Sequence, residues 1–190
     1  MLISNEWLKD YVNVDQSVQA LAERITRTGI EVDDIIDYTK DIKKLVVGHV
    51  LSKTPHPDAD KLNICQVDLG EEEPVQIVCG APNVDEGQHV IVAKVGGRLP
   101  GGIKIKRAKL RGERSEGMIC SLQEIGISSH VTPKNYESGI YVFPEAVKPG
   151  TDALEAIYLN DQVMEFDLTP NRADALSMVG TAYELSLIHI

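Results

Sequence analysis

Apolar residues recur with a helical period near the start of the chain. Four of them fall on one face of a predicted α-helix: Val18, Leu21, Ala22 and Ile25. Asp15 precedes this run as a candidate N-cap, and Gly29 follows it where a left-handed C-terminal cap is favoured. Residues 30–38, rich in Ile, Val and acids, indicate a strand that leaves the helix.

The period changes to that of short β-strands in the middle of the chain. Five β-type runs are separated by turn-rich segments: residues 45–52, 62–69, 75–78, 89–95 and 103–110. Short strands with no long helix between them indicate a small barrel or a sandwich, and a five-stranded Greek-key barrel such as the OB-fold is the leading candidate. Within residues 62–69 the apolar alternation slips by one position, which predicts a β-bulge in that strand.

Helix and strand signals return at the carboxyl end. Residues 140–143 indicate a strand, Thr151 opens a short helix, and a further strand ends in FDLTPN. A last helix is predicted with one apolar face: Leu176, Val179, Gly180 and Tyr183. Because neither end is long enough to bury a core alone, we predict an α+β fold, with the five-stranded OB-fold β-barrel inserted into a discontinuous small α+β domain. The expected boundaries are residues 1–39 with 151–190 for the discontinuous domain and 40–150 for the barrel and its connector.

The bulk composition is that of an ordinary globular protein. Hydrophobic residues make up 43% of the chain, but no apolar run approaches the roughly 20 residues that span a bilayer, so no membrane partner is expected. The start lacks the basic leader and long apolar core of a secretory signal. The three cysteines form no CxxC pair, so neither a zinc site nor a disulfide framework is predicted, and a reducing, cytoplasmic location is expected.

Positive charge is concentrated in one segment of an acidic chain. The formal net charge of −10 repels nucleic acid at long range, so RNA binding requires a local patch. Six of the 19 cations lie within residues 103–114: Lys104, Lys106, Arg107, Lys109, Arg111 and Arg114. On a strand with a bend near Arg107 these side chains rim a groove and predict phosphate contact; a solvated strand that prevents edge pairing is the alternative. Arg98, in the preceding GGRLPGG turn, is a further candidate.

Other candidate chemistry is weaker. The barrel region contains no Phe, Tyr or Trp, so RNA contact there would depend on charge and shape rather than on base stacking. His56, Asp58 and Asp60 could ligate a metal, but the prolines around them favour a turn in which the Asp side chains bond nearby amides. Ser115 and Ser121 have no local His to activate them, so we predict no catalytic residue and no metal site in this chain.

Several motifs in order resemble a known family. The middle contains VVGHVLSKTPHPDADKLNICQVDLG, IVCGAPNV and AKLRGERSEGMICS. These resemble the tRNA-binding OB-fold shared by phenylalanyl-tRNA synthetase β subunits, methionyl-tRNA synthetase C-terminal modules and free tRNA-binding proteins. The ends contain ISNEWLKDYV, LAERITRTGIEVDDI and FDLTPNRADALSMVGTAYEL. They resemble the split first domain of bacterial phenylalanyl-tRNA synthetase β subunits, although Ala173 stands where that family usually has proline.

The resemblance implies a non-catalytic tRNA-binding and assembly module of a class II synthetase, phenylalanine–tRNA ligase. That enzyme is an (αβ)₂ heterotetramer that joins phenylalanine to tRNA with ATP and magnesium. The implied partners are therefore tRNA and the synthetase α subunit. In the family the aminoacylation site lies on the α subunit and the proofreading site lies further along β, so we expect this chain to be part of a longer protein and to hold no cofactor itself.

The family's motif places the RNA-contact candidates on the basic strand from Lys104 to Arg111, on Arg114, and on the segment from Ser115 to Ser121. Two other interpretations stay open. A free-standing tRNA-binding protein shares the OB-fold, although the split domain at both ends argues against it. A structural spacer without intrinsic RNA binding is compatible with the acidic charge and the lack of aromatic residues.

Overall fold

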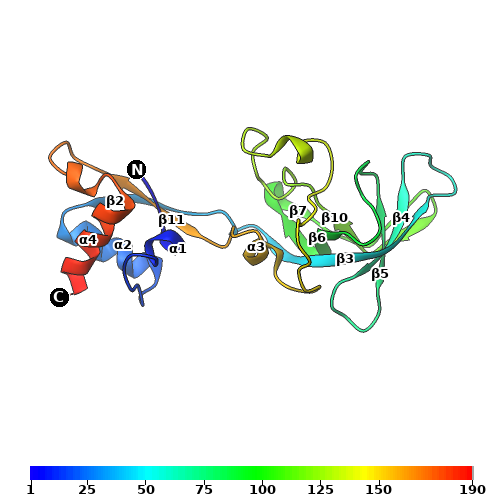
Figure 1. The fold of residues 1–190 in the computed structure, drawn as a ribbon, viewed down its shortest axis with the longest axis horizontal. Helices are drawn as coiled ribbons and strands as arrows, with labels where there is room; N and C mark the ends of the chain where they lie inside the picture. The colour runs from blue at the N-terminus through cyan, green and yellow to red at the C-terminus, as the bar shows by residue number, and fades with distance from the viewer. Residues whose placement is uncertain (190) are drawn as a thin grey trace. The chain divides into compact units, whose positions relative to one another are not determined.

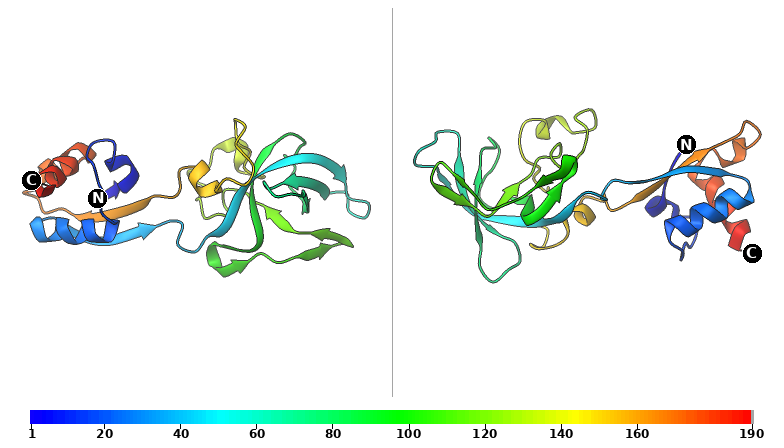
Figure 2. Two further views of the ribbon diagram at one scale, coloured as in Figure 1. Left: turned by 90° about the horizontal axis from the view of Figure 1, so that it is seen from below. Right: turned by 180° about the vertical axis from the view of Figure 1, so that it is seen from behind.

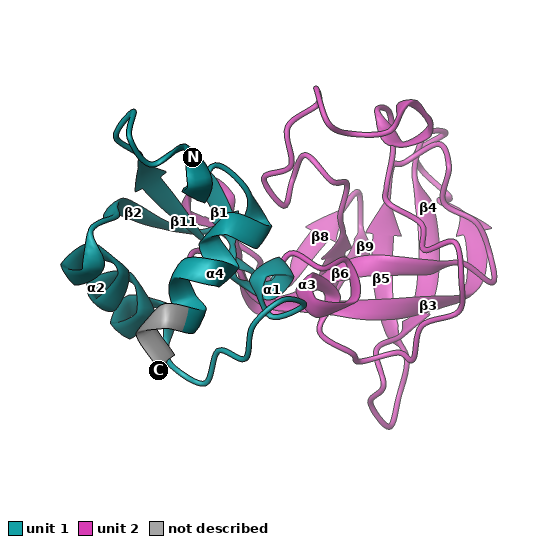
Figure 3. Ribbon diagram, turned by 60° about the vertical axis from the view of Figure 1, so that its left-hand side comes forward, with its two compact units in different colours: residues 1–38, 160–190 teal, residues 39–159 magenta. Residues whose placement is uncertain are grey.

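The computed structural model describes the backbone of residues 1–189 and the side chains of residues 1–186. The chain forms two compact units, residues 1–38 with 160–190 and residues 39–159 (Figure 1, Figure 3). Antiparallel sheets predominate and the helices are few, so the chain has an α+β fold.

Unit 1 is a small sheet covered by helices. Its three strands lie in the order β1 (Leu2–Ser4), β11 (Gln162–Asp167) and β2 (Glu31–Asp37), all antiparallel. The strand from the carboxyl segment therefore lies between the two from the amino segment, as Figure 1 shows for β2 and β11. One apolar cluster joins this sheet to α1 (Asn5–Leu8), α2 (Val18–Thr28) and α4 (Met178–His189).

Helix α2 matches the predicted apolar face but not the predicted N-cap. Val18, Leu21, Ala22 and Ile25 are all buried. Gly29 ends the helix with φ 112°, in the left-handed region that glycine occupies without strain. The side chain of Ser17, not Asp15, caps the start by accepting from the Ala20 N–H at 3.3 Å, because Ser17 is the residue that directly precedes the first helical turn.

The predicted apolar face of the last helix is wrong. Val179 and Tyr183 are exposed, as is Leu176, which precedes the helix. The side chains of α4 that pack into the core of unit 1 are instead those of Met178, Ala182 and Leu185. A 3-10 turn, η3 (Ala173–Ala175), precedes the helix, which starts at Met178, and the close approach of Gly180 to the Asp174 backbone accompanies the observed orientation.

The TPNR corner before η3 is held by an ion-pair network. The guanidinium of Arg172 lies 3.1 Å from Asp174 and 2.7 Å from Glu184. The two carboxylates raise the pKa of Arg172, and the Arg172 side chain lowers the pKa of Asp174. Arg172 therefore joins the turn to helix α4 through its two acidic partners.

Unit 2 is built on a six-stranded antiparallel sheet. Five strands lie in the order β10 (Gly117–Ile119), β6 (His89–Leu99), β3 (Lys43–Pro55), β4 (Asn63–Asp68) and β5 (Val75–Cys79). The short β7 (Ile103–Lys104) adds to β6. The long β3, cyan in Figure 2, pairs with β4 along one part of its length and with β6 along another. The remaining strands, β8 (Ala108–Leu110) and β9 (Glu113–Ser115), pair only with each other in the described part of the chain.

The sheet of unit 2 is buried on both faces. Val90 and Val92 of β6 belong to one apolar cluster with β4, β5 and β10, while Ile91 and Ala93 belong to a second. The second cluster is completed by residues that follow the strands: Leu122, Ile125, Phe143, Ala153 and Leu154. Residues 128–139, expected from composition to be a polar connector, contribute Tyr136 to the cover of the sheet, and Phe143 after them is buried in the same cluster.

Several strands differ from their predicted bounds. The segment predicted as the fifth strand, residues 103–110, is divided between β7 and β8, and the fifth strand of the main sheet is β10. The predicted strand at residues 140–143 is reduced to a single bridge between Val142 and Val90. The bulge expected in residues 62–69 lies instead in β3, where Leu51 is the extra residue between Val50 and Ser52. Either strand of a pair can accommodate the extra residue, so the sequence located the pair but not the strand.

Residues 151–159 lie with unit 2, not with the discontinuous unit in which the sequence analysis placed them. They include α3 (Ala153–Ala156), whose N-cap is Asp152 and not Thr151. Ala153 and Leu154 are buried in the same cluster as Leu45 and Val47 of β3, and burial of these apolar side chains holds the segment against the sheet.

Candidate nucleic-acid interface

The first element of the site is a row of cations across three strands. Arg98 of β6 lies directly opposite Lys104 of β7 on one side and opposite Lys43 of β3 on the other. Directly opposed residues of antiparallel strands project to the same face, with Cβ atoms about 5 Å apart. All three side chains belong to exposed residues, and no described ion pair includes any of them. We call Lys43, Arg98 and Lys104 the cation row.

The second element is the β8–β9 hairpin, which carries the centre of the basic segment. Its two-residue turn is formed by Arg111 and Gly112, with φ of 48° and 97°, as the primed turns of tight hairpins require. Lys109 lies directly opposite Arg114 in the hairpin register. Like charges in this position repel each other, so the pair destabilises the free hairpin and creates a site for an anion.

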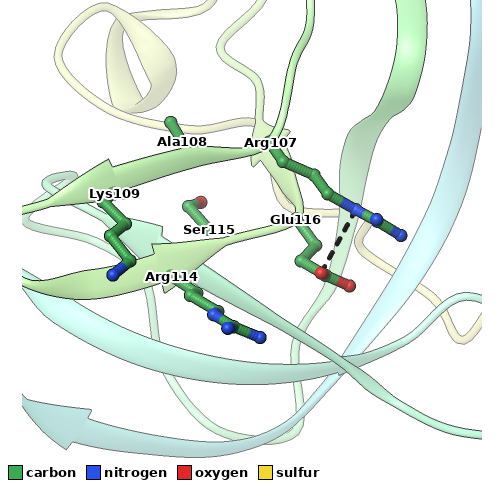
Figure 4. Close-up of a pocket in the computed structure, with 6 residues that line it drawn as sticks. All are labelled: Arg107, Ala108, Lys109, Arg114, Ser115 and Glu116. Carbon is green, nitrogen blue, oxygen red and sulfur yellow. Dashed lines mark ion pairs between the residues drawn. The ribbon is translucent and has the colours of Figure 1, made fainter.

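Open depressions flank this charged face. One, of about 360 Å³, is lined by Arg107, Ala108, Lys109, Arg114, Ser115 and Glu116. Figure 4 shows the side chains of Lys109 and Arg114 on the same side of the hairpin, with Arg107 beside Glu116. A second depression, of about 400 Å³, shares Lys109, Arg114 and Glu116 and extends toward β5. A polyanion in either one lies next to both opposed cations.

The predicted cations are exposed, and one of them is paired with an acid. Lys104, Lys106, Arg107, Lys109, Arg111 and Arg114 are exposed residues, as is Arg98. Within the described residues only Arg107 of this set forms an ion pair, with its Nε 3.3 Å from the Glu116 carboxylate. The segment is therefore not a buried ion-pair cluster, and its cations are available to a ligand.

Buried polar contacts hold the hairpin against the sheet. Ser115 is 3% exposed; its hydroxyl accepts from the Val78 N–H at 3.1 Å and donates to the Gly117 carbonyl at 3.0 Å. The Gln76 side chain donates to the Arg114 carbonyl at 2.9 Å and to the Glu113 carboxylate at 3.2 Å. These bonds orient β9 so that Arg114 projects outward.

The two serines predicted as RNA contacts are engaged within the fold. The Ser115 hydroxyl is buried with both of its bonds internal, so it supports the hairpin and does not present itself to a ligand. The Ser121 hydroxyl donates to the Glu124 carboxylate at 3.0 Å and accepts from the Glu124 N–H at 3.3 Å, a reciprocal capping pair. Their side-chain roles depend on neighbours that the sequence pattern did not reveal.

His56 supports the tip of the hairpin rather than forming part of a metal site. Its Nε2 lies 3.0 Å from the Leu110 carbonyl, and its Nδ1 accepts from the Asp58 N–H at 3.0 Å. The segment is a turn, as the sequence favoured, but the ring of His56 makes the local bond that was expected of the Asp side chains. Among the described residues no group of three or more His, Cys, Asp or Glu could hold a metal ion.

The cysteines do not offer a nucleophile. Burial raises the pKa of the Cys65 thiol to about 11 and that of Cys120 to about 12, and it also raises the pKa of Cys79. All three are free and buried. At neutral pH they are protonated thiols inside the apolar core.

One exposed cation of the site was missed by the sequence analysis. Lys43 is far from the basic segment along the chain, but β3 brings it opposite Arg98. The available signal was the Lys43-Lys44 pair at the start of an apolar strand. Only the register of β3 against β6 shows that Lys43 belongs with Arg98 and Lys104.

Comparison with known proteins identifies the family of the chain. The sequence profile of the family described as "Putative tRNA binding domain" matches residues 45–152, more than half of the chain. The chain therefore belongs to the tRNA-binding domain family. It is 97% identical over 189 residues to the phenylalanine–tRNA ligase beta subunit of Staphylococcus epidermidis (strain ATCC 12228) and 82% identical to that of Staphylococcus aureus (strain USA300). Both alignments cover 100% of this chain and 24% of the relative, so the chain spans about a quarter of their length.

These relatives confirm the resemblance to bacterial phenylalanyl-tRNA synthetase β subunits. Among solved structures, the MetRS related protein from Pyrococcus horikoshii is 23% identical with a TM-score of 0.40, over 60% of this chain and 90% of that one. A likeness at this level does not define the fold. No helix within residues 1–189 is long and apolar enough to cross a bilayer.

Proposed function

We propose that residues 39–159 form an OB-fold that binds tRNA through its phosphate backbone, within a non-catalytic module of a phenylalanine–tRNA ligase β subunit. The observation that carries the proposal is the pair of exposed cross-strand cation sets, the cation row and Lys109 with Arg114. Opposed like charges without acidic partners are unfavourable in the free protein and become favourable next to a polyanion.

The strand order supports the OB-fold assignment. Five-stranded Greek-key barrels are completed where the third strand meets the fifth. Here β5, the third strand of the sheet in chain order, lies beside β9 and β10, and the Glu116 N–H donates to the Gln76 carbonyl at 2.8 Å. In the described residues no continuous ladder joins β5 to β10, so the closure consists of this bond and of side-chain contacts such as that of Ser115.

Binding through phosphates rather than through bases fits the surface of unit 2. The strands and loops of residues 45–125 contain no Phe, Tyr or Trp. Base stacking on aromatic rings is the usual means of gripping splayed single strands, whereas folded RNA presents mainly backbone. Four aromatic residues occur elsewhere in unit 2. Tyr136, Tyr141 and Phe143 contact one another and are partly or fully buried, whereas Tyr158 is exposed but follows α3, outside the strands that carry the two cation sets.

The proposal extends to the enzyme that the relatives' names describe. In the complete ligase this chain would act as an accessory, together with an α subunit in an (αβ)₂ heterotetramer, in the cytoplasm. ATP and magnesium would be used on the α subunit and not by these residues. Incubating the chain with ATP, magnesium, phenylalanine and tRNA should yield no charged tRNA; a charged product would contradict the accessory role.

A salt titration tests the RNA-binding part of the proposal. We expect binding of a phenylalanine tRNA transcript to weaken with salt along a log–log slope of about −3.5 to −4.5, if the five cations of the two sets neutralise phosphates. The double variant Lys109→Gln/Arg114→Gln should flatten that slope by about 1.4–1.8, as should Lys43→Gln/Arg98→Gln. Filter binding at several salt concentrations measures both.

The matched control is Lys61→Gln/Lys148→Gln, which removes the same charge from exposed positions of the same unit that belong to neither cation set. It should leave the slope nearly unchanged. If the wild-type chain does not bind tRNA, or if all three double variants flatten the slope equally, the basic surface has no specific role. The chain would then be a structural spacer.

A further inference from the structure

Glu116 is an acid placed within the basic site. It follows β9 directly and lies beside Arg107, with the carboxylate 3.3 Å from the guanidinium Nε (Figure 4). It also lines both depressions that contain Lys109 and Arg114. A carboxylate at this point lowers the positive potential where an RNA phosphate would lie.

We infer that Glu116 is an internal competitor of the RNA phosphate: it occupies Arg107 in the free protein, and a bound phosphate displaces it. This inference rests on the proposed RNA-binding function and adds a residue that limits affinity at the same site. The geometry makes the displacement feasible, because the Arg107 side chain is 75% exposed and that of Glu116 is 35% exposed. Ion pairs this exposed are weak, whereas a phosphate can engage a guanidinium through two parallel hydrogen bonds.

Backbone contacts hold Glu116 where it can compete. Its N–H donates to the Gln76 carbonyl at 2.8 Å, and its neighbours Ser115 and Gly117 are tied together by the Ser115 hydroxyl. Gly117 has φ 151°, and a Cβ there would lie 3.1 Å from the Ala93 carbonyl oxygen, so the backbone after Glu116 is closely packed. The acid therefore cannot leave the site by a shift of the main chain; only its side chain can rotate away.

The test compares Glu116→Gln with Glu113→Gln. Both variants remove one negative charge from the same hairpin, but the Glu113 carboxylate is bonded to Gln76 and no described ion pair joins it to a cation. We expect Glu116→Gln to tighten tRNA binding by about two- to fivefold, and Glu113→Gln to tighten it less, because loss of the competing ion pair adds to the general charge effect.

A second comparison tests whether the gain in tRNA affinity depends on Arg107. In an Arg107→Gln background the additional gain of Glu116→Gln over Glu113→Gln should disappear, because no guanidinium remains to be released. Circular dichroism of each variant confirms that the fold is intact. Equal binding by the two acid variants, weaker binding by Glu116→Gln, or a gain that persists without Arg107 would each overturn the inference. Failure of the wild-type chain to bind tRNA would instead overturn the proposed function on which it rests.

Discussion

Unit 2 contains two antiparallel strand pairs, β3–β6 and β8–β9, whose opposed residues differ in polarity and in exposure. In β3–β6 the opposed residues are apolar and buried: Val47 faces Ile91 and Leu45 faces Ala93, each at most 1% exposed. In β8–β9 the opposed residues Lys109 and Arg114 are charged and exposed. Burial of apolar surface stabilises the first pair, whereas the second depends on bonds to residues outside it, such as the bond from the Val78 N–H to the Ser115 hydroxyl. The comparison shows which strands build the fold and which present a surface to a ligand.

The largest expected effect comes from the core of the β3–β6 pair. Ile91→Ala should lower the free energy of unfolding of unit 2 by about 2–5 kcal/mol, since it leaves a cavity at a fully buried position. The matched control is Ile103→Ala in β7, where the side chain is 54% exposed and the loss should be below about 1 kcal/mol. Urea unfolding followed by circular dichroism measures both. Equal losses would mean that β3–β6 is not the stabilising pair.

Removing an anchor of the hairpin should have a smaller effect. Ser115→Ala leaves the buried Val78 N–H without its acceptor, which should cost about 1–3 kcal/mol of unfolding free energy. Ser129→Ala, at an exposed position, should change stability by less than about 0.5 kcal/mol. Urea titrations of the two variants provide the measurement. No loss in Ser115→Ala would show that the hairpin is held by other contacts.

Acid should weaken the β3–β6 pair through His89. His49 and His89 are opposed, with their rings stacked at 4.5 Å, and burial together with His49 lowers the pKa of His89 from its ordinary value of 6.5. The unfolded chain therefore binds more protons than the folded one as the pH falls through about 6.5, so stability decreases in that range and is restored above it.

Urea unfolding at pH 7.5 and pH 5.0 measures this dependence. His89→Gln should make the loss between the two pH values smaller, while His130→Gln, at an exposed position, should leave it unchanged. The prediction fails if the His89 variant loses as much stability on acidification as the wild-type chain does.

The smallest expected effect is a gain in the free energy of unfolding. Lys109→Gln removes the repulsion between opposed cations and should raise the unfolding free energy by about 0.2–0.5 kcal/mol, while it weakens tRNA binding. Lys61→Gln provides the control at an exposed lysine outside the hairpin. Urea denaturation measures the gain in unfolding free energy, and filter binding on the same preparations measures the loss of tRNA affinity. A variant that loses both stability and binding would show that Lys109 supports the fold and not the ligand.

Local patterns were enough to predict α2, β2 and β11 of unit 1 and most strands of unit 2, whereas β1 and α1 were not predicted. The buried face of α2 and its glycine cap follow from side-chain spacing and from the freedom of glycine at positive φ, and neither requires a distant neighbour. The start of α4 could not be predicted from side-chain spacing. Its inward face depends on where the preceding turn ends, and that turn is set by packing of Gly180 against the Asp174 backbone.

Only part of the candidate site could be predicted from the sequence, because the rest depends on contacts between distant segments. The sequence alone determined that cations gather between residues 103 and 114, that the chain is acidic elsewhere, and which family the motifs resemble. The tertiary structure alone decided that Lys43 lies beside Arg98, that Ser115 turns inward, and that Glu116 pairs with Arg107. Composition and period are properties of neighbouring residues along the chain. Which side chains meet across strands depends on register, and register is set by pairing between distant segments and by bulges that local sequence does not locate.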